Sequence, residues 1–349
     1  MNMEELYDVT IIGGGPAGLY ATFYSGLRAM KTKLIEYQPQ LGGKLHVYPE
    51  KMIWDVGGHA PITGEKLREQ LVTQALTFNP TVLLNEKVDT IEQREDGVFL
   101  LKTASGQEHI SKTIIIAVGS GILKPQKLQI EGAERFEITN LHYTVKSLKR
   151  FKGKTVIISG GGNTAIDWAN ELVPIAKKVY LTYRKQSLNG HEAQVSQLLN
   201  SSATCFFHTT ITKLIASSDH ETIEQVELTN HETGDVIQLP VDEVIINHGY
   251  EQDTSLLVNS HLSIQMADHH YIAGNAKGES SIPGVYAAGD ILKYDGKLYL
   301  IAGAFHDAAN AVNSAKQFIE PTADPYAMVS SHNEAFKERN KQLIKQLIK

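Results

Sequence analysis

Two glycine-rich turns, each set between an apolar strand and a helical segment, constrain this 349-residue chain more than any other feature. Residues 13–18 (GGGPAG) follow the apolar stretch 8–12, and residues 160–165 (GGGNTA) follow the stretch 155–159. Turns of the form GxGxxG or GxGxxA let the backbone approach a pyrophosphate, and they aim the N-terminus of the next helix at it. Two such units predict two dinucleotides on one polypeptide. The pair that they indicate is a flavin and a nicotinamide, between which a hydride passes.

The residues of the first turn have distinct expected tasks. Gly13 permits the tight turn, Gly15 lets the backbone come close to phosphate, and Gly18 lets the helix pack on the strand. Pro16 and Ala17 open the helix whose free N–H groups face the anion. The alternative is a glycine turn that serves packing alone.

The second turn repeats this arrangement with one change. Gly160 and Gly162 correspond to Gly13 and Gly15, and Ala165 stands where the first turn has its third glycine. Asn163 and Thr164 open the second helix. Because both copies lie between a strand and a helix, the sequence predicts a bound coenzyme at each.

The ends of the second strands distinguish the two coenzymes. Glu36 ends the second strand of the first unit, where a carboxylate accepts hydrogen bonds from the ribose of an adenosine. Arg184 and Lys185 occupy the matching place in the second unit, and cations there attract a 2′-phosphate. The first site is therefore predicted to take the flavin dinucleotide and the second NADP. The alternatives are a solvated strand end at Glu36 and a surface charge pair at 184–185.

The predicted fold class is α/β, with two Rossmann-like dinucleotide-binding domains of which the second is inserted in the first. Residues 1–120 and 285–349 are expected to form the FAD-binding domain, and residues 121–284 the NADP-binding domain. The expected helices cover residues 17–30, 64–77, 163–173 and 303–318. The expected strands cover residues 32–36, 81–84, 88–93, 98–103, 113–119, 155–159, 178–183 and 244–249.

Composition narrows the function classes. The net charge of −6 does not favour nucleic acid, and no apolar run is long enough to span a bilayer. The acidic start, residues 1–5, lacks the features of a signal peptide, so we expect a cytoplasmic protein. Cys205 is the one cysteine, which excludes an internal disulfide and a Cys-x-x-Cys redox pair. The scattered histidines indicate no metal site.

With these residues in hand, the chain resembles the thioredoxin-reductase-like ferredoxin/flavodoxin–NADP reductases of bacteria over nearly its whole length. The motifs that carry the likeness are residues 13–18 (GGGPAG), 40–44 (QLGGK), 48–51 (YPEK), 55–56 (DV), 140–143 (NLHY), 160–169 (GGGNTAIDWA) and 287–290 (AAGD). Thioredoxin reductases carry a Cys-x-x-Cys near the place where residues 142–145 (HYTV) stand here. Its absence removes thiol exchange and is the pattern of the ferredoxin-type relatives.

The resemblance implies a set of FAD contacts. Glu36 would hold the adenosine ribose, Lys44 would lie near the phosphates or the ribityl chain, and Tyr48 would stack on the isoalloxazine ring. Asp290 would bind the ribityl or pyrophosphate region. Val88 would meet adenine through its backbone groups. The other implied contacts are Gln40, Gly43, Leu123 and, from a C-terminal extension that often reaches the partner subunit's flavin, Ser331 and His332.

The resemblance also implies a weakened grip on the 2′-phosphate. Relatives usually present His-Arg-Arg and a further arginine, where this chain has Tyr183, Arg184, Lys185 and Asn189. Lysine lacks the bidentate fork of arginine. We therefore expect preference for NADPH, with a smaller margin over NADH.

The implied enzyme is a ferredoxin–NADP(+) reductase. It uses no catalytic side chain, because hydride passes from NADPH to flavin N5 and single electrons then leave for ferredoxin or flavodoxin. Homodimerisation is implied by relatives alone. Two other classes stay open: an NADPH-dependent flavoenzyme with another acceptor, such as a quinone or a ferric chelate, and a non-catalytic flavin or nicotinamide sensor. Residues 146–154 (KSLKRFKGK) are a candidate docking patch for an acidic partner, with a solvated helix end as the alternative.

Overall fold

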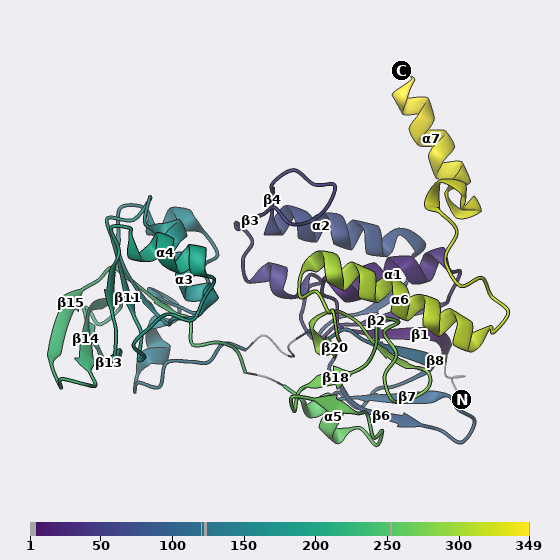
Figure 1. Ribbon diagram of the computed structural model, residues 1–349, viewed down its shortest axis with the longest axis horizontal. Coiled ribbons are helices and arrows are strands. Elements are labelled where there is room, and N and C mark those ends of the chain that lie inside the picture. Colours follow the sequence, from purple (N-terminus) through teal and green to yellow (C-terminus); the bar gives the residue numbers. More distant parts are fainter. Residues whose placement is uncertain (1–4, 120, 122–123, 252, 349) are drawn as a thin grey trace. The chain divides into compact units, whose positions relative to one another are not determined.

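The computed structural model of the protein describes residues 5–119, 121, 124–251 and 253–348. The chain divides into two compact units. Unit 1 contains Met1–His46, Lys51–Ile122 and Gln252–Lys349, and unit 2 contains Val47–Glu50 and Leu123–Glu251. Each unit is described here by itself (Figure 1).

Unit 1 is built on a seven-stranded sheet in the order β5-β2-β1-β8-β7-β6, with β19 also paired to β8. The strands β5, β2, β1, β8 and β19 run parallel, and β7 and β6 add antiparallel pairs at one edge. The described strands of the unit are β1 (Leu6–Ile12), β2 (Thr32–Ile35), β3 (Met52–Ile53), β4 (Ile62–Thr63), β5 (Thr81–Leu83), β6 (Val88–Gln93), β7 (Phe99–Thr103), β8 (Glu108–Ile116), β17 (Met266–Ala267), β18 (Tyr271–Ala273), β19 (Val285–Ala287) and β20 (Leu292–Lys293). The continuous apolar sequences of β1 and β8 reflect burial on both faces of the sheet.

Helices cover one face of this sheet. The helices α1 (Pro16–Leu27), α2 (Gly64–Ala75) and α6 (Ile301–Ile319) lie together on that face, and α6 also packs on β8 and β19 (Figure 1). The alanine-rich buried side of α6 lets it approach α1 closely. The short helix α5 (Ser255–Asn259) packs on β6, and α7 (Lys337–Leu347) has no buried residue.

The segment before β19 packs with unit 1. Leu256, Ile264 and Ile272 belong to the same buried cluster as Ile114 of β8 and Phe99 of β7. The structure thus returns the chain to the first unit near residue 252, whereas the sequence places the return at 285. Because these apolar side chains lie on short elements in a loop-rich stretch, no periodic pattern indicates in advance which core they join.

Unit 2 is built on a five-stranded parallel sheet in the order β12-β11-β10-β16-β9. Its described strands are β9 (Leu141–His142), β10 (Thr155–Ser159), β11 (Lys178–Thr182), β12 (Thr204–Phe206), β13 (Thr209–Ala216), β14 (Ile223–Asn230), β15 (Val236–Pro240) and β16 (Glu243–Ile246), and its helices are α3 (Asn163–Leu172) and α4 (Glu192–Leu199). The first two strands and α3 form the predicted βαβ unit. The strand order places a topological switch point between β10 and β16, where doubly wound sheets bind ligands.

Strand β10 supplies two separate cores because its side chains alternate between faces. Val156 and Ile158 join the cluster beneath α3, together with Ala165, Ile166 and other buried residues. Ile157 faces the opposite cluster, which includes Ile211 of β13 and Val226 and Leu228 of β14. The antiparallel sheet β13-β14-β15 thus covers the face of the parallel sheet that α3 leaves open.

Among the residues that the structure describes, none of the helices has the length and apolarity needed to cross a membrane.

Tyr48 packs against the α3-side core of unit 2, which explains why its short segment groups with that unit rather than with the residues on either side.

Candidate functional site

The first glycine turn, between β1 and α1, has no room for side chains at two positions. Gly13 has a φ of +105°, and a Cβ there would lie 2.5 Å from the carbonyl oxygen of Ala117. A Cβ at Gly18 would lie 1.8 Å from the carbonyl oxygen of Gly13. At Gly15, the N-cap of α1, the nearest atom to such a Cβ is 3.8 Å away. The glycine at this last position therefore serves approach by a ligand rather than packing, as the phosphate-binding turn requires.

Glu36 is held against this turn. Its side chain is 7% exposed, and its two oxygens accept hydrogen bonds from Gly14 N (2.5 Å) and Gln38 N (2.7 Å). Burial raises the pKa of the Glu36 carboxyl, against the lowering effect of those two N–H donors. The carboxylate is thus fixed at the carboxyl end of β2, where an adenosine ribose is expected.

The loop after β2 folds back onto the same turn. Gly42 N donates to Gly14 O at 2.8 Å, and a Cβ at Gly43 would lie 2.8 Å from the Cα of Gly15. This close approach carries Lys44, in the 3₁₀ turn η1 (Gly43–His46), to Asp290, with 2.9 Å between Nζ and Oδ2. Two site residues predicted from distant parts of the sequence thus meet, while Gln40 stays exposed on the loop.

Asp290 lies in the turn η5 (Gly289–Ile291), which is fastened from α6. Gly289 has a φ of +76°, and a Cβ there would lie 2.9 Å from the Cβ of Ala17 at the start of α1. Gly289 N donates to Asp307 Oδ2 at 3.1 Å, and Asp307 also pairs with the buried Lys297. The carboxylate of Asp290 is therefore positioned next to the N-terminal end of α1.

The structure does not gather every predicted flavin contact in unit 1. The side chain of Val88 is 4% exposed and belongs to the hydrophobic core, which leaves its backbone groups for the predicted contact with adenine. Ser331 and His332 are exposed in η6 (Ser330–His332), and the next residue, Asn333, donates to Leu27 O at the carboxyl end of α1, away from the glycine turn. Tyr48 groups with unit 2, and Leu123 lies outside the described residues. Their roles at the flavin stay predictions.

The second glycine turn is also crowded at two of its glycines. A Cβ at Gly160 would lie 2.4 Å from Asn247 O, and one at Gly161 would lie 2.3 Å from the ring of Tyr183. At Gly162, the N-cap of α3, no atom lies within 4 Å of such a Cβ. As in unit 1, the turn is closed by packing at one end and open at the N-terminus of the helix.

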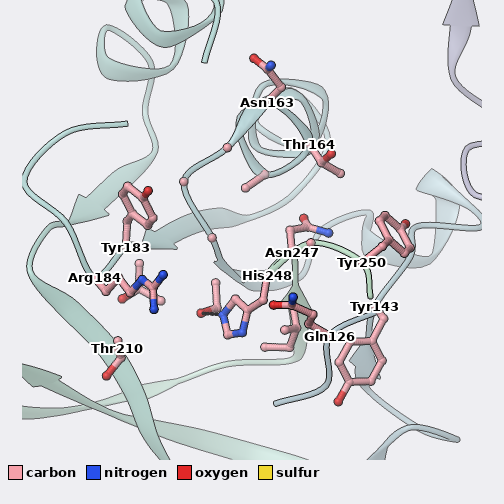
Figure 2. A pocket seen from close by; sticks show the side chains of 18 of the residues that line it. Gln126, Tyr143, Asn163, Thr164, Tyr183, Arg184, Thr210, Asn247, His248 and Tyr250 are labelled. Carbon is pink, nitrogen blue, oxygen red and sulfur yellow. Dashed lines mark hydrogen bonds between the residues drawn. The ribbon is translucent and has the colours of Figure 1, made fainter. Parts of the chain in front are cut away.

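This open side faces a cavity of about 480 Å³ (Figure 2). The volume lies within the usual range for sites that bind small molecules and cofactors. The cavity is bordered by the glycine turn and by the carboxyl ends of β10, β11 and β16, with Asn163 and Thr164 at its edge. Side chains that sequence reasoning did not assign also line it: Gln126, Tyr143, Thr210, Asn247, His248 and Tyr250.

The predicted 2′-phosphate residues separate in the structure. Arg184 lines the cavity and is exposed, whereas Lys185 is not among the lining residues. Asn189, which stands where relatives are expected to carry a further arginine, donates its backbone N–H to Gly161 O at 2.7 Å. The loop after β11 therefore folds over the glycine turn and brings a single permanent cation to the cavity.

Two polar residues at the end of β16 complete the cavity wall. Asn247 Oδ1 is buried and has no hydrogen-bond partner among the described residues. His248 Nε2 lies 2.9 Å from Ser159 Oγ, the last side chain of β10. An apolar strand that runs into polar residues could have indicated both as site residues. The predicted strand 244–249 includes them, whereas β16 ends at Ile246.

The donor groups of both cradles fit dinucleotides. The first offers a bare helix N-terminus and a fixed ribose acceptor in Glu36. The second offers a bare helix N-terminus, the cation Arg184, and an orphaned buried acceptor in Asn247. Neither helix has a side-chain cap at its N-terminus, so the free N–H groups remain available to an anion.

In the basic segment 146–154, Arg150 and Lys154 lie at the amino end of the unit 2 sheet, opposite the cavity, because they contact the first residue of β16 and Lys154 directly precedes β10. Arg150 and Lys154 both pair with Glu243, whose side chain is 1% exposed and which also contacts His142. Burial would raise the pKa of Glu243, but hydrogen bonds from His142 and Lys154 outweigh it and hold the pKa below its usual value. Lys146, Lys149 and Lys152 are exposed, and within the described part of the chain they form no ion pair.

The described residues contain neither a cysteine pair for thiol exchange nor a cluster of side chains placed to bind a metal ion. Cys205 lies on β12 and is half-buried, and burial raises the pKa of its thiol. No group of three or more His, Cys, Asp or Glu side chains is placed to hold a metal ion among the residues that were described.

Comparison with known proteins agrees with this geometry. The family model described as pyridine nucleotide-disulphide oxidoreductase matches residues 7–315. The chain is 73% identical to ferredoxin–NADP reductase 1 of Bacillus mycoides over 349 residues, covering 100% of both chains. It is 67% identical to ferredoxin–NADP reductase 2 of Exiguobacterium sibiricum over 348 residues, covering 100% of this chain and 99% of that one.

Solved structures show the same fold. Thioredoxin reductase of Lactococcus lactis superposes with a TM-score of 0.74 at 25% identity, over 90% of this chain and 99% of that one. Thioredoxin reductase of T. acidophilum superposes with a TM-score of 0.75 at 23% identity, over the same shares of the two chains. The predicted two-domain, thioredoxin-reductase-like fold is confirmed. The chain therefore belongs to the pyridine nucleotide-disulphide oxidoreductase family, in which its full-length relatives are the bacterial ferredoxin–NADP reductases.

Proposed function

We propose that the protein is a ferredoxin–NADP reductase that binds FAD in unit 1 and NADP(H) in unit 2. The observation that carries this proposal is the contrast at the end of the second strand of each glycine-turn unit. Unit 1 has the buried carboxylate Glu36 there, and unit 2 has the exposed cation Arg184. One cradle suits an unphosphorylated adenosine ribose, and the other suits a 2′-phosphate.

In unit 1, Glu36 would accept the ribose hydroxyls, and the N-terminus of α1 at Gly15 and Pro16 would face the pyrophosphate. Lys44 and Asp290, paired at 2.9 Å, would lie beside the phosphates and the ribityl chain. Tyr48, Val88, Leu123 and Gln40 remain proposed contacts on the basis of the family resemblance. The bonds that already hold Glu36 mean that little rearrangement is needed before the coenzyme binds.

In unit 2, the N-terminus of α3 at Gly162, Asn163 and Thr164 would hold the pyrophosphate. Arg184 would reach the 2′-phosphate from the end of β11, with Lys185 as a second, weaker cation outside the cavity. The order of strands supports a pose with the adenosine half over β11 and the nicotinamide half over β16. Asn247, the first residue after β16, would therefore meet the nicotinamide side.

When bound, FAD supplies the exchange between a hydride and single electrons, chemistry that no side chain of this protein provides. The work of the protein is to hold, orient and shield. The glycine turns admit the phosphates, Glu36 and Arg184 select the adenosine moieties, and the walls of the unit 2 cavity exclude water from part of the coenzyme. No side-chain acid, base or nucleophile is required by this assignment.

Ferredoxin is the acceptor named for the full-length relatives. The lone, half-buried Cys205 supports this choice, because a dithiol relay is unavailable to the chain. Flavodoxin is a second proposed partner, since it presents the same acidic character. The exposed cations Lys146, Lys149 and Lys152 are the part of the basic segment free to meet such a partner.

We further propose a homodimer in the cytoplasm. The placement of Ser331 and His332 near the carboxyl end of α1 supports the dimer, because these residues do not meet the glycine turn of their own chain. Light scattering of the purified protein tests this point, and a monomeric mass at working concentration would contradict it.

Reduction of cytochrome c by NADPH tests the function. We expect turnover only when ferredoxin is added to the FAD-loaded enzyme. Equal rates without ferredoxin would favour an enzyme with another acceptor, and no turnover with flavin bound would favour a sensor. The triple variant Lys146→Ala/Lys149→Ala/Lys152→Ala should raise the KM for ferredoxin at low salt and leave NADPH oxidation with ferricyanide unchanged. An unchanged KM would remove this segment from docking.

A further inference from the structure

The unit 2 cavity has few positive charges for the anion it is proposed to hold. Arg184 is the one permanently charged side chain among the described residues that line it. The coenzyme brings a pyrophosphate and, in NADP, a 2′-phosphate as well. The N-terminus of α3 offsets part of this charge, with an effect close to half a unit charge. The remaining lining residue able to become positive is His248.

His248 is built into the floor beside the glycine turn. Its Nε2 lies 2.9 Å from Ser159 Oγ, and Ser159 directly precedes Gly160 and is 4% exposed. The backbone N–H of Asn247 donates to Ser159 O at 2.8 Å, which fixes the strand end that carries the histidine. The second ring nitrogen, Nδ1, has no hydrogen-bond partner among the described residues. Figure 2 shows the ring facing the same part of the cavity as Arg184.

The groups around His248 leave it uncharged while the cavity lacks an anion. Burial of the ring in the cavity wall, with the charge of Arg184 as a second cause, lowers the pKa of His248. Ser159, Thr210 and Gln126 are uncharged, and burial raises the pKa of the phenols of Tyr143 and Tyr250. No carboxylate is among the described lining residues. Nearby charges beyond the lining also leave the ring without a counter-ion: Glu251 pairs with Lys124 at 3.0 Å, and His231 bonds to Thr210 at 2.8 Å.

Resting on the proposed function, we propose that His248 is a phosphate ligand that becomes protonated when the coenzyme binds, so that binding takes up a proton. Its ring would donate from Nδ1 to the pyrophosphate, with Nε2–H donating to Ser159 Oγ. The pyrophosphate is the assigned partner because His248 is bonded to Ser159, which directly precedes the glycine turn, whereas the 2′-phosphate belongs to Arg184 at the end of β11.

The direction of the pH dependence follows from this arrangement. An adjacent anion favours the imidazolium, so the pKa of His248 is higher in the complex than in the free enzyme. Affinity for the coenzyme then rises as pH falls through the pKa of the complex, and it levels off below the pKa of the free enzyme. A rise of one pKa unit corresponds to about tenfold tighter binding.

Calorimetric titration of the full-length, FAD-loaded, oxidised enzyme with NADP+ measures the linkage. Titrations at pH 7 in buffers of different ionisation enthalpy give the number of protons taken up. We expect net uptake by the natural protein, and a Kd about tenfold lower at pH 6 than at pH 8. The variant His248→Gln keeps a donor for Ser159 Oγ but cannot be protonated. With NAD+, which has no 2′-phosphate, it should show a nearly flat Kd between these pH values, with the largest loss of affinity at pH 6.

NAD+ separates His248 from the coenzyme's own titration. The 2′-phosphate of NADP+ changes protonation near pH 6, while NAD+ has only the pyrophosphate. Proton uptake with NAD+, lost in His248→Gln, supports the proposal. Uptake with NADP+ alone, or uptake that survives in His248→Gln, overturns it.

A matched control is His231→Gln, which alters the nearby histidine outside the cavity lining and should keep natural proton uptake. Loss of uptake in this control instead of in His248→Gln would also overturn the assignment. Failure of the enzyme to bind NADP+ at any pH would contradict the proposed function itself, so the two failures are distinguishable. Flavin absorbance confirms that each variant is folded and loaded.

Discussion

The two glycine turns have similar backbones. They differ in how many of the polar groups around them already have hydrogen-bond partners and in how enclosed they are. In unit 1 the ribose acceptor Glu36 is 7% exposed and already bonded to two backbone N–H groups, and a second loop is fastened over the turn. In unit 2 the cation Arg184 is exposed beside an open cavity, and the buried Asn247 Oδ1 has no hydrogen-bond partner among the described residues. A preformed, enclosed cradle suits a resident coenzyme, and an open one suits a coenzyme that exchanges at each turnover.

The same difference extends to helix packing. Gly18 leaves no space for a methyl group, so α1 lies as close to β1 as a backbone permits. Unit 2 has Ala165 at the matching position, and this alanine is fully buried without a clash. The tolerances of the two turns to substitution are therefore predicted to differ, and four variants test how far the contrast holds.

The largest effect is expected for Gly18→Ala. The added Cβ would lie 1.8 Å from Gly13 O, so the turn must shift, at a cost of about 3 kcal/mol of the free energy of unfolding. Loss of FAD should follow, measured as flavin absorbance per chain together with urea unfolding. The matched variant Ala165→Gly should keep FAD and cost about 1 kcal/mol. A yellow Gly18→Ala protein of natural stability would break the comparison.

Next comes Arg184→Ala, which removes the permanent cation of the open cavity. A charge-assisted hydrogen bond to phosphate contributes about 2 kcal/mol, so kcat/KM for NADPH should fall about thirtyfold. The value for NADH should change little, because NADH lacks the 2′-phosphate. Lys185→Ala is the control and should have a smaller effect, since Lys185 does not line the cavity. Equal losses with both coenzymes would assign Arg184 to another part of the ligand.

A smaller effect is expected for Gly162→Ala. No atom lies within 4 Å of the added Cβ, so unit 2 should unfold at the natural urea concentration. The methyl group stands where phosphate approaches, and the Kd for NADP+ should rise about tenfold. NAD+ should be weakened by a similar factor, because the pyrophosphate is common to both. An unchanged Kd would place the pyrophosphate elsewhere.

The smallest effect is expected for Asn189→Arg, which tests whether the open cradle is improvable. Asn189 is exposed, and its contact to the turn uses only backbone atoms, so the side chain is free to change. A second arginine near Arg184 should raise the ratio of kcat/KM for NADPH over NADH by about threefold. A fall in this ratio would show that the loop after β11 points away from the 2′-phosphate.

Much of the fold was predictable because its signals are local. The sequence predicts the strand–turn–helix units at both glycine turns to within a few residues. A run of isoleucines likewise indicates the buried strand β8. The pairing of Lys44 with Asp290 was not visible, but both residues were selected through the family resemblance.

Other features depend on contacts that no local pattern reports. The segment 253–284 joins unit 1 through a few apolar side chains spaced irregularly along the sequence. His248 becomes a site residue only because β16 lies next to β10, and strand order is set by the whole sheet. The absence of Lys185 from the cavity lining likewise depends on the path of the loop after β11.

Glu243 sits at the amino end of β16, and the coenzyme cavity lies at the carboxyl end of the same strand. The ion pairs of Glu243 at the amino end of the sheet are thus separated from the residues at the carboxyl end that contact the ligand. Substitutions at the ligand end, natural or engineered, can therefore leave the ion pairs at the amino end intact. Coenzyme preference is thus open to redesign in the loop after β11 without a change to the ion pairs of Glu243.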